Sequence, residues 1–340
     1  MTDVMTIQRH ILETERRYPH ATGRFTGLLQ HIALAAKVVA AKVRRAGLQD
    51  EILGGTGISN IQGEHVKKLD VLAHDTLAQM MIESGYLAVM ASEERENVIL
   101  VPDDHRRGSY VVNFDPLDGS SNIEANVSIG TIFSILARRT PQNESPVKED
   151  CMQPGRRQLA AGYILYGSST MLIYTTGAGV HGFTYDPMIG SFILSHPSIK
   201  IPERGKIYSV NMGNQRFWSE GVRRYIDGLH ENDPQSSRPY SLRYIGSLVS
   251  DFHRNLLYGG IFLYPADNKK NPSVFKPKLR LLYEANPLAY IVEQAGGLAT
   301  DGRTNILDIE PTELHQRVPL FIGSKSDVEE LMESIRHYDF

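Results

Sequence analysis

Segment 110–121 constrains the fold and the chemistry of this 340-residue chain more than any other part. Its sequence, YVVNFDPLDGSS, begins with β-branched and aromatic residues that are typical of a buried strand. We predict that the strand ends at Asp115, because Pro116 cannot continue the ladder, and that the following loop brings Asp115 and Asp118 together. Ser121 and the acid three residues later have capping-box spacing, which predicts a short helix with an anion-binding N-terminus. The same residues also fit an ordinary Pro-Gly turn.

A second acidic pair follows the preceding predicted strand. The predicted strand over residues 87–91 is short and apolar, and Glu93 and Glu94 come directly after Ser92. In open α/β sheets ligands collect at the carboxyl ends of strands, so two strands that end in paired carboxylates predict one shared site. Further acids that the pattern places at element ends are Glu64, Asp70 and Glu284. Such a cluster is expected to hold hard divalent cations, and its oxygen ligands favour Mg²⁺ or Mn²⁺.

Cations beside an anion-binding helix end are the apparatus for phosphate hydrolysis by an activated water. The hydroxyls of Ser120 and Ser121 are predicted to cap the helix rather than to attack, since no histidine is placed to activate them. The second half supplies groups suited to a second phosphate, far from the cations. These are Asn211, Arg243, Tyr244, Tyr264 and Lys278.

The sequence lacks the residues that several other classes of protein require. The only cysteine, Cys151, permits no intrachain disulfide and no thiolate zinc cluster, and neither an HExxH nor a GxxxxGK[ST] sequence occurs. A formal net charge of −3 gives no reason to expect nucleic acid or an anionic membrane surface as a partner. Lys37 and Lys42 interrupt the most apolar helical stretch, and no signal peptide is recognised. We therefore expect a cytoplasmic enzyme with a small substrate and no membrane partner.

The pattern of helices and strands predicts an α/β protein with two sheets and helical layers. Helices are expected over residues 28–46, 64–84, 245–258, 279–295 and 326–337, and strands over 131–137, 162–166, 171–175, 192–195, 206–212 and 260–264. Residues 48–63 are rich in Gly, Ser and Thr and predict a mobile loop that could act as a lid. The sequence GAGVHG at 177–182 matches a dinucleotide fingerprint, but no helix follows it, so we predict a hairpin. Pro and Gly residues at 197–205 predict a boundary between domains 1–196 and 197–340.

With these motifs in place, the chain closely resembles the class 1 fructose-1,6-bisphosphatase family of the lithium-sensitive, metal-dependent sugar phosphatases. The segments that carry the resemblance are 66–70, 92–94, 111–131, 161–167, 243–247, 258–265 and 279–297. The resemblance implies a five-layer αβαβα fold, a homotetramer, and hydrolysis of fructose 1,6-bisphosphate to fructose 6-phosphate and phosphate. It also implies that the N-terminal domain, of the regulatory type, carries most metal ligands and that the C-terminal domain binds the sugar phosphate.

The resemblance assigns roles residue by residue. Two to three Mg²⁺ ions per subunit would be bound by Glu93, Asp115, Asp118, Glu284, Glu64 and the Leu117 carbonyl, and Glu94 with Asp70 would activate water. The scissile phosphate would be held by Asp118, Gly119, Ser120 and Ser121. The sugar and its distal phosphate would contact Asn211, Tyr244, Tyr264 and Lys278, with Arg243 contributed across a subunit interface.

Several positions depart from the family pattern. Glu64 stands where an aspartate is usual, and Asn214 where a tyrosine contacts the distal phosphate. In the region that binds AMP in animal members, Thr22, Gly23, Thr26 and Tyr110 match, but Arg24, Ser109 and Ala137 replace an acid, a lysine and an arginine. We therefore expect weak or absent AMP inhibition. Two alternatives remain open: a dual fructose-1,6-/sedoheptulose-1,7-bisphosphatase, and a catalytically silent metabolite-sensing protein on the same fold.

Overall fold

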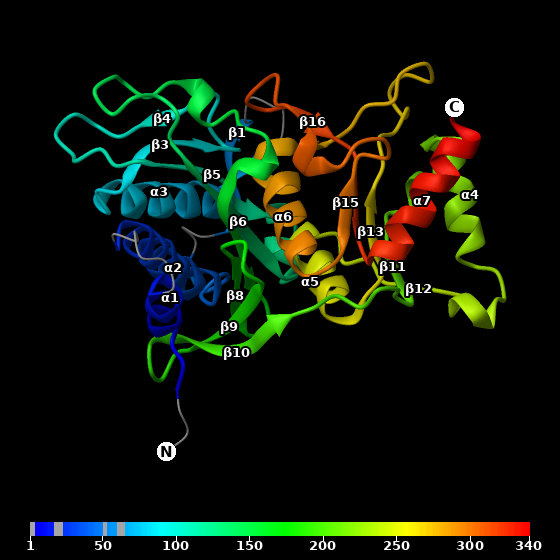
Figure 1. Ribbon diagram of the computed structural model, residues 1–340, viewed down its shortest axis with the longest axis horizontal. Coiled ribbons are helices and arrows are strands. Elements are labelled where there is room, and N and C mark those ends of the chain that lie inside the picture. Colours follow the sequence, from blue (N-terminus) through cyan, green and yellow to red (C-terminus); the bar gives the residue numbers. More distant parts are fainter. Residues whose placement is uncertain (1–3, 17–22, 50–52, 60–64) are drawn as a thin grey trace.

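Two β-sheets form the framework of the protein in the computed structural model, which describes residues 4–16, 23–49, 53–59 and 65–340 (Figure 1). The larger sheet has eight strands in the order β10-β9-β8-β7-β6-β5-β3-β4. These are β3 (Leu87–Ser92), β4 (Ile99–Leu100), β5 (Tyr110–Asp118), β6 (Ile129–Ala137), β7 (Gln158–Tyr166), β8 (Thr170–Thr175), β9 (Val180–Asp186) and β10 (Ser191–Ile199). Only β3 and β5 pair in parallel among them.

The smaller sheet has five strands in the order β12-β11-β13-β17-β15. These are β11 (Ile207–Ser209), β12 (Ser241–Leu242), β13 (Ile261–Tyr264), β15 (Leu298–Thr300) and β17 (Leu320–Gly323). Two strand pairs lie outside both sheets: β1 (Gly55–Ser59) with β2 (His65–Lys67), and β14 (Leu279–Arg280) with β16 (Arg317–Val318).

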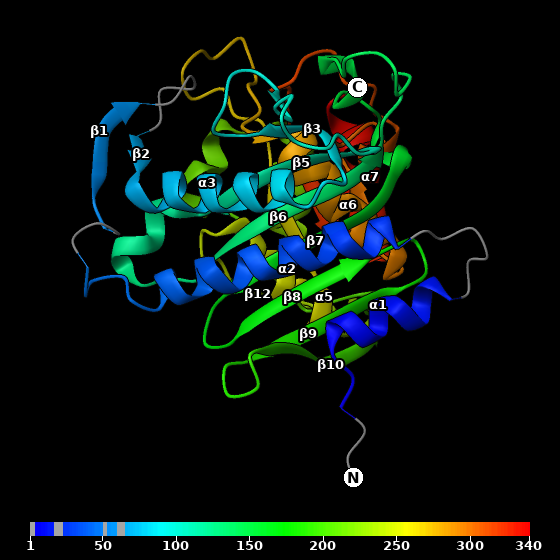
Figure 2. The same cartoon turned by 90° about the vertical axis from the view of Figure 1, so that its left-hand side faces the viewer.

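Helices cover the sheets in three layers, which completes an αβαβα arrangement (Figure 1). The first layer contains α1 (Ile7–Glu15), α2 (Arg24–Val43) and α3 (Lys68–Glu83), which lie side by side across the larger sheet (Figure 2). Between the sheets lie α5 (Leu248–Tyr258) and α6 (Asn286–Gln294), and on the outer face of the smaller sheet lie α4 (Glu220–Gly228) and α7 (Lys325–Tyr338). The predicted α/β class and layered fold are confirmed.

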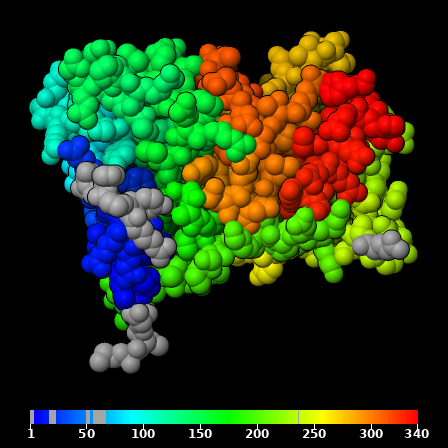
Figure 3. Space-filling model, in the orientation of Figure 1, coloured from blue at the N-terminus to red at the C-terminus, as the bar shows by residue number. Residues whose placement is uncertain are grey.

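Each interface between layers is filled by apolar side chains. The central strands of the larger sheet read as continuous apolar runs because helices cover both faces; β3 is buried at every position. Phe252 and Leu256 of α5 and Leu288 of α6 pack between the two sheets, and all three are fully buried. The two halves of the chain meet along a broad seam (Figure 3).

By length and composition alone, helix α2 could cross a membrane. Half of its most apolar window is buried inside the protein, where Leu28, Leu29 and Ile32 join the core beneath the larger sheet. This packing accounts for the apolar composition of α2 without a bilayer.

Four expectations about local structure were wrong. Strand β1 lies within the predicted loop 48–63, because it pairs with β2, and β2 in turn occupies the predicted start of the second helix. The single helix predicted over 279–295 begins instead as β14 and a π-helical turn, η6 (Leu281–Ala285). The strand predicted to stop at Asp115 continues to Asp118. The hairpin predicted at 177–182 is confirmed, since β8 and β9 pair there from Thr175 and Val180.

Candidate active site

A β-bulge in β5 places the two aspartates of the motif. Asp115 pairs with Ile132 of β6 and Asp118 pairs with Gly130, so β5 carries one residue more than its partner over this stretch. Pro116 is compatible with the bulge because the extra residue there needs no ladder N–H. The carbonyl of Pro116 accepts a hydrogen bond from Thr131 Oγ1 at 2.8 Å, and Asp115 Oδ1 accepts one from the Leu117 amide at 2.9 Å. The strand therefore keeps both acids on its buried end instead of releasing them into a loop.

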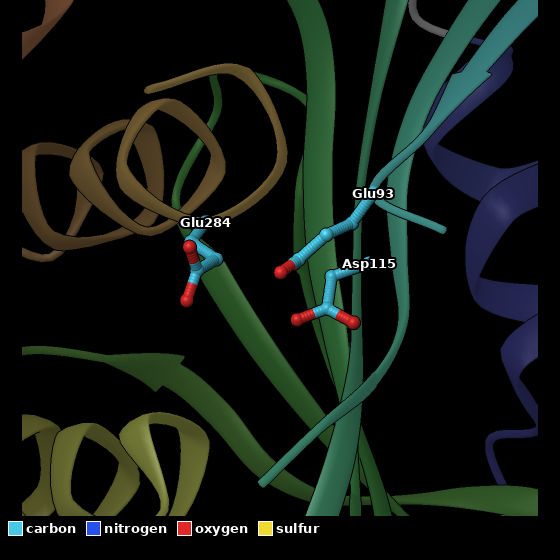
Figure 4. A group of neighbouring side chains, drawn as sticks. All are labelled: Glu93, Asp115 and Glu284. Atoms are coloured by element: carbon cyan, nitrogen blue, oxygen red, sulfur yellow. The ribbon is translucent and has the colours of Figure 1, made fainter. Parts of the chain in front are cut away.

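Three carboxylates from different elements converge beside this bulge. Glu93 follows β3, Asp115 lies on β5 and Glu284 lies on η6 (Figure 4). One oxygen of each lies within 4.8 Å of the others, and all three residues are buried. Glu284 Oε2 accepts a hydrogen bond of 2.6 Å from the amide of Arg280, the residue of β14 that precedes the π-helical turn, and this contact holds the carboxylate in place. Asp118 and Leu117 line the same cavity, which has a volume of about 590 Å³.

Burial makes this cluster costly to ionise. Desolvation raises the pKa of Asp115 well above its usual value, and the nearby Glu93, Asp118 and Glu284 raise it further. The pKa of Glu284 is likewise raised, first by burial and then by Glu93, and burial raises that of Asp118 to about 7. A dense set of buried carboxylate oxygens with these shifts fits a hard divalent cation, which would favour the ionised forms.

Two basic residues that the sequence analysis did not single out also line the cavity. Arg280 is buried, and its Nη2 lies 3.2 Å from Glu93 Oε1. Lys67 also lines the cavity, and its Nζ forms an ion pair of 2.9 Å with Glu124. Lys67 and Arg280 both fall within segments that carry the family resemblance. Their positive charge is the signal in the sequence that could have identified them as residues of the site. They add positive charge beside an otherwise acidic cavity.

The segment after the bulge opens a short 3₁₀-helix, η1 (Ser120–Ala125), but not through the predicted capping box. Gly119 precedes the helix with φ +78°, a left-handed conformation that favours glycine, and no side chain caps the helix. Ser121 therefore lies inside η1 rather than at its N-cap. Gly119, Ser120 and Ser121 all line the cavity, as predicted for residues that approach one phosphate.

The two residues predicted to activate water both lie near Glu93: Glu94 follows it in sequence, and the charge of Glu93 raises the pKa of Asp70. Glu94 lines the cavity, and Asp70 is buried at the start of α3. Asp70 accepts a hydrogen bond of 2.9 Å from the Lys67 amide, and a hydrogen bond from the Ser120 side chain lowers its pKa. Burial outweighs these contacts and raises the pKa of Asp70 to about 6. Glu64 lies outside the described residues.

The residues predicted to bind the distal phosphate are divided between two hollows and the surface. Tyr244 and Tyr264 line the cavity that holds the acids. Asn211 and Lys278 line a smaller adjoining pocket that shares Tyr264 and also contains Asn214. Arg243 lines neither hollow; it is exposed, and its Nη1 donates to the Leu242 carbonyl at 2.9 Å. The chain by itself thus brings together the predicted residues of the distal group except Arg243.

Comparison with known proteins gives matches over almost the whole chain. Residues 5–197 match a family described as "Fructose-1-6-bisphosphatase, N-terminal domain", and residues 201–336 match "Fructose-1-6-bisphosphatase, C-terminal domain". A "Fructose-1,6-bisphosphatase class 1" of Chloroherpeton thalassium is 58% identical over 339 residues, which covers 99% of this chain and 95% of that protein. The protein of the same name from Chlorobium luteolum is 55% identical and covers 99% and 100%.

Solved structures give the same result. Leishmania major fructose-1,6-bisphosphatase in holo form aligns with a TM-score of 0.89 at 43% identity, covering 98% of this chain and 99% of that one. The apo form of the same enzyme aligns with a TM-score of 0.85 at 42% identity and with the same coverage. The predicted family and enzyme class are thereby confirmed: the chain belongs to the fructose-1,6-bisphosphatase family, phosphatases that depend on a divalent metal and hydrolyse fructose 1,6-bisphosphate.

Proposed function

We propose that this chain removes the 1-phosphate of fructose 1,6-bisphosphate with Mg²⁺ as its natural cation, two to three ions per subunit, and with Mn²⁺ as a possible substitute. The observation that carries the proposal is the buried convergence of Glu93, Asp115 and Glu284 within 4.8 Å. Oxygen-only donors in a buried, acidic setting suit Mg²⁺ better than zinc. We assign Asp118, the Leu117 carbonyl and Glu64 to the same set of ligands.

The side chains around the cluster are proposed to orient the reacting groups. When bound, divalent cations polarise phosphoryl oxygens and lower the pKa of an attacking water. Glu94 and Asp70 would accept the proton of that water, because each lies beside the acidic cluster. Asp118, Gly119, Ser120 and Ser121 would hold the scissile phosphate, since they form the wall of the cavity next to the carboxylates.

The far end of the site is proposed to bind the sugar and the second phosphate. Tyr244 and Tyr264 offer hydroxyl groups at the cavity wall, and Asn211 and Lys278 offer an amide and a cation in the adjoining pocket. The exposed Arg243 is proposed to act on the site of a neighbouring subunit in a homotetramer. We further propose the division into domains 1–196 and 197–340 and a cytoplasmic location.

Weak AMP inhibition is supported by a contact at the start of α2. The carboxylate of Glu15 accepts hydrogen bonds from the Gly23 amide at 2.5 Å and from Thr26 Oγ1. Both partners belong to the predicted AMP region, and here an internal anion occupies their donors. A nucleotide phosphate would have to displace it. Strong AMP inhibition that disappears in Tyr110→Phe would contradict this proposal.

Phosphate release with and without Mg²⁺ tests the proposed function. Wild-type protein is expected to release phosphate from fructose 1,6-bisphosphate, to stop when the cation is chelated, and to lose activity in Glu93→Gln. Glu96→Gln is the matched control, because Glu96 is an exposed acid three positions away. Full activity in Glu93→Gln would contradict the assignment.

The same assay with sedoheptulose 1,7-bisphosphate tests the dual-specificity alternative. Comparable turnover of both substrates would establish the broader activity. Release from neither substrate in the presence of Mg²⁺ would favour the silent metabolite sensor instead.

A further inference from the structure

A second cavity lies at the other end of η1 from the active-site cavity, and we call it the rear cavity. It has a volume of about 610 Å³, within the range of small-molecule sites, and shares no lining residue with the active-site cavity. Its walls come from the end of α2, the second half of η1 and the turn between β7 and β8. Residues at the active-site end of η1, Ser120 and Ser121, face the proposed phosphate, whereas Ile123 and Glu124 face the rear cavity.

The lining of the rear cavity has the chemistry of a site for a small hydroxylated anion. Arg44 supplies a cation; it donates to Thr170 Oγ1 at 3.3 Å and lies over the Tyr185 ring at 5.4 Å. A guanidinium has five N–H donors, so this one hydrogen bond leaves capacity for a ligand. Ser128 and Ser168 add hydroxyl groups to the wall. The acid in the wall, Glu124, is already balanced by its ion pair with Lys67, so the net character is positive.

One chain of buried hydrogen bonds joins the rear cavity to the metal-binding bulge. The hydroxyl of Tyr166, which lines the cavity, lies 2.9 Å from Thr131 Oγ1. Thr131 donates its own proton to the Pro116 carbonyl at 2.8 Å, so Tyr166 must donate to Thr131. Both residues are buried, and Pro116 lies between Asp115 and Leu117.

A second chain reaches Asp118. The carbonyl of Ser128, in the cavity wall, is 3.2 Å from Ser250 Oγ, which is 3.1 Å from Ser247 Oγ. Ser247 in turn donates to Asp118 Oδ2 at 3.2 Å. The hydroxyl of Ser250 has one proton, which it can donate either to the Ser128 carbonyl or to Ser247 Oγ. A ligand that moves the Ser128 carbonyl can therefore change which hydrogen bond Ser250 makes.

We infer that the rear cavity is an effector site for a small hydroxylated anion, such as a phosphorylated or carboxylated metabolite. A ligand held by Arg44 and the hydroxyl groups would shift η1 and the two hydrogen-bond chains, and through them the residues proposed to bind metal and phosphate. The inference rests on the proposed function, because the effect is read at that active site.

Cysteine tethering tests this inference in the full-length chain. Ser168→Cys places a thiol in the cavity wall, while the native Cys151 is buried and burial raises the pKa of its thiol, so it stays inert. Modification with 2-sulfonatoethyl methanethiosulfonate installs an anion, and methyl methanethiosulfonate installs a small neutral group. Ser145→Cys, an exposed position outside the cavity, is the matched control.

We expect the sulfonate on residue 168 to change kcat/KM for fructose 1,6-bisphosphate by about fivefold or more, with a smaller effect from the neutral group and none in the control. Thr131→Val, which cuts the first hydrogen-bond chain, should reduce that effect. Unchanged kcat/KM after complete modification, verified by mass spectrometry, would overturn the inference. An equal effect from both reagents would do the same, because it would show crowding rather than anion recognition.

Protection of the thiol tests the ligand class without turnover. Glycerol 3-phosphate at millimolar concentration should slow sulfonate labelling of Ser168→Cys, and adding Arg44→Ala should abolish the protection. No protection would refute an anion site. Wild-type hydrolysis of fructose 1,6-bisphosphate is measured first; its absence would refute the proposed function, whereas labelling and protection do not depend on it.

Discussion

The acidic end of the site and its distal-phosphate end differ in how their side chains are supported. Glu93, Asp115 and Glu284 are buried, and each lies on or directly after a strand or helical turn of the central layers. Lys278 and Tyr244 lie on irregular segments and are partly exposed. Chemistry that depends on cation geometry needs the first kind of support, whereas recognition of a phosphate by a flexible cation tolerates the second. The comparison predicts that changes at the acidic end reduce kcat and that changes at the distal end raise KM.

The largest effect is expected from Asp115→Asn. Loss of one carboxylate from the cluster should lower kcat by about 10³-fold, because the variant removes a ligand and leaves the others without a cation to neutralise them. Steady-state phosphate release measures it, with Asp103→Asn as an exposed control. Since the residue is deeply buried, unfolding is monitored in parallel. Wild-type kcat in Asp115→Asn would break the distinction between the two ends.

Lys278→Ala should act on KM. The Nζ of Lys278 now forms an ion pair of 3.0 Å with Asp267, and in the complex we expect it to bind the distal phosphate. Losing a charge-assisted contact costs about 2 kcal/mol, or about 30-fold in KM, with little change in kcat. Lys270→Ala, on the same loop and exposed, serves as the control. A variant with reduced kcat and unchanged KM would contradict a purely binding role.

The free energy of unfolding should depend on pH through a histidine that lies between the two sheets. His253 on α5 lies 2.7 Å from the Tyr163 hydroxyl on β7, and burial lowers the pKa of His253 to about 4. The unfolded chain binds this proton near pH 6.5, so stability is lost as pH falls from that value toward the folded pKa. Between pH 7.5 and pH 5 the loss should be about 2 kcal/mol for this residue.

Chemical denaturation at several pH values measures that loss. His253→Gln should reduce the pH dependence, and His337→Gln, at an exposed position, should leave it unchanged. His74, whose pKa is also lowered by burial to about 4, should supply a further part. If the pH dependence of the free energy of unfolding is the same in His253→Gln and wild-type protein, protonation of His253 does not destabilise the fold.

The smallest effect is expected from Tyr244→Phe. Removing one hydroxyl from the cavity wall should raise KM about fivefold, the value of one neutral hydrogen bond. Tyr258→Phe is the control because Tyr258 is 69% exposed. A drop in kcat without a change in KM would place Tyr244 with the acidic end rather than with the distal end.

The acidic end could be predicted from sequence further than the distal end. The order of strand and acid at Glu93 and Asp115 is local information, and the packing of β3 beside β5 in parallel turns it into a shared site. The bulge could not be foreseen, because it depends on which residues of β6 face Asp115 and Asp118. A proline at position 116 favours either a turn or a bulge, and only the partner strand decides.

Tertiary contacts also decided the helix starts. Glu284 belongs to segment 279–295, which has helical periodicity. The segment nevertheless begins as strand β14, because Leu279 and Arg280 pair with β16, which lies far along the chain. The η1 segment begins after Gly119 in a left-handed conformation, which its sequence permits but does not require. The distal residues carried almost no local signal, since a tyrosine or lysine in a loop is typical of any surface.

Direct binding of Mn²⁺ in the absence of substrate tests the central claim that β3, β5 and η6 together build a cation site. Calorimetric titration of wild-type protein should show saturable binding with release of protons, since burial raises the pKa of Asp115, Asp118 and Glu284. Asp115→Asn should weaken that binding by about tenfold or more while the exposed Asp103→Asn binds as wild type does. Equal Mn²⁺ affinity in Asp115→Asn and wild-type protein would contradict the account.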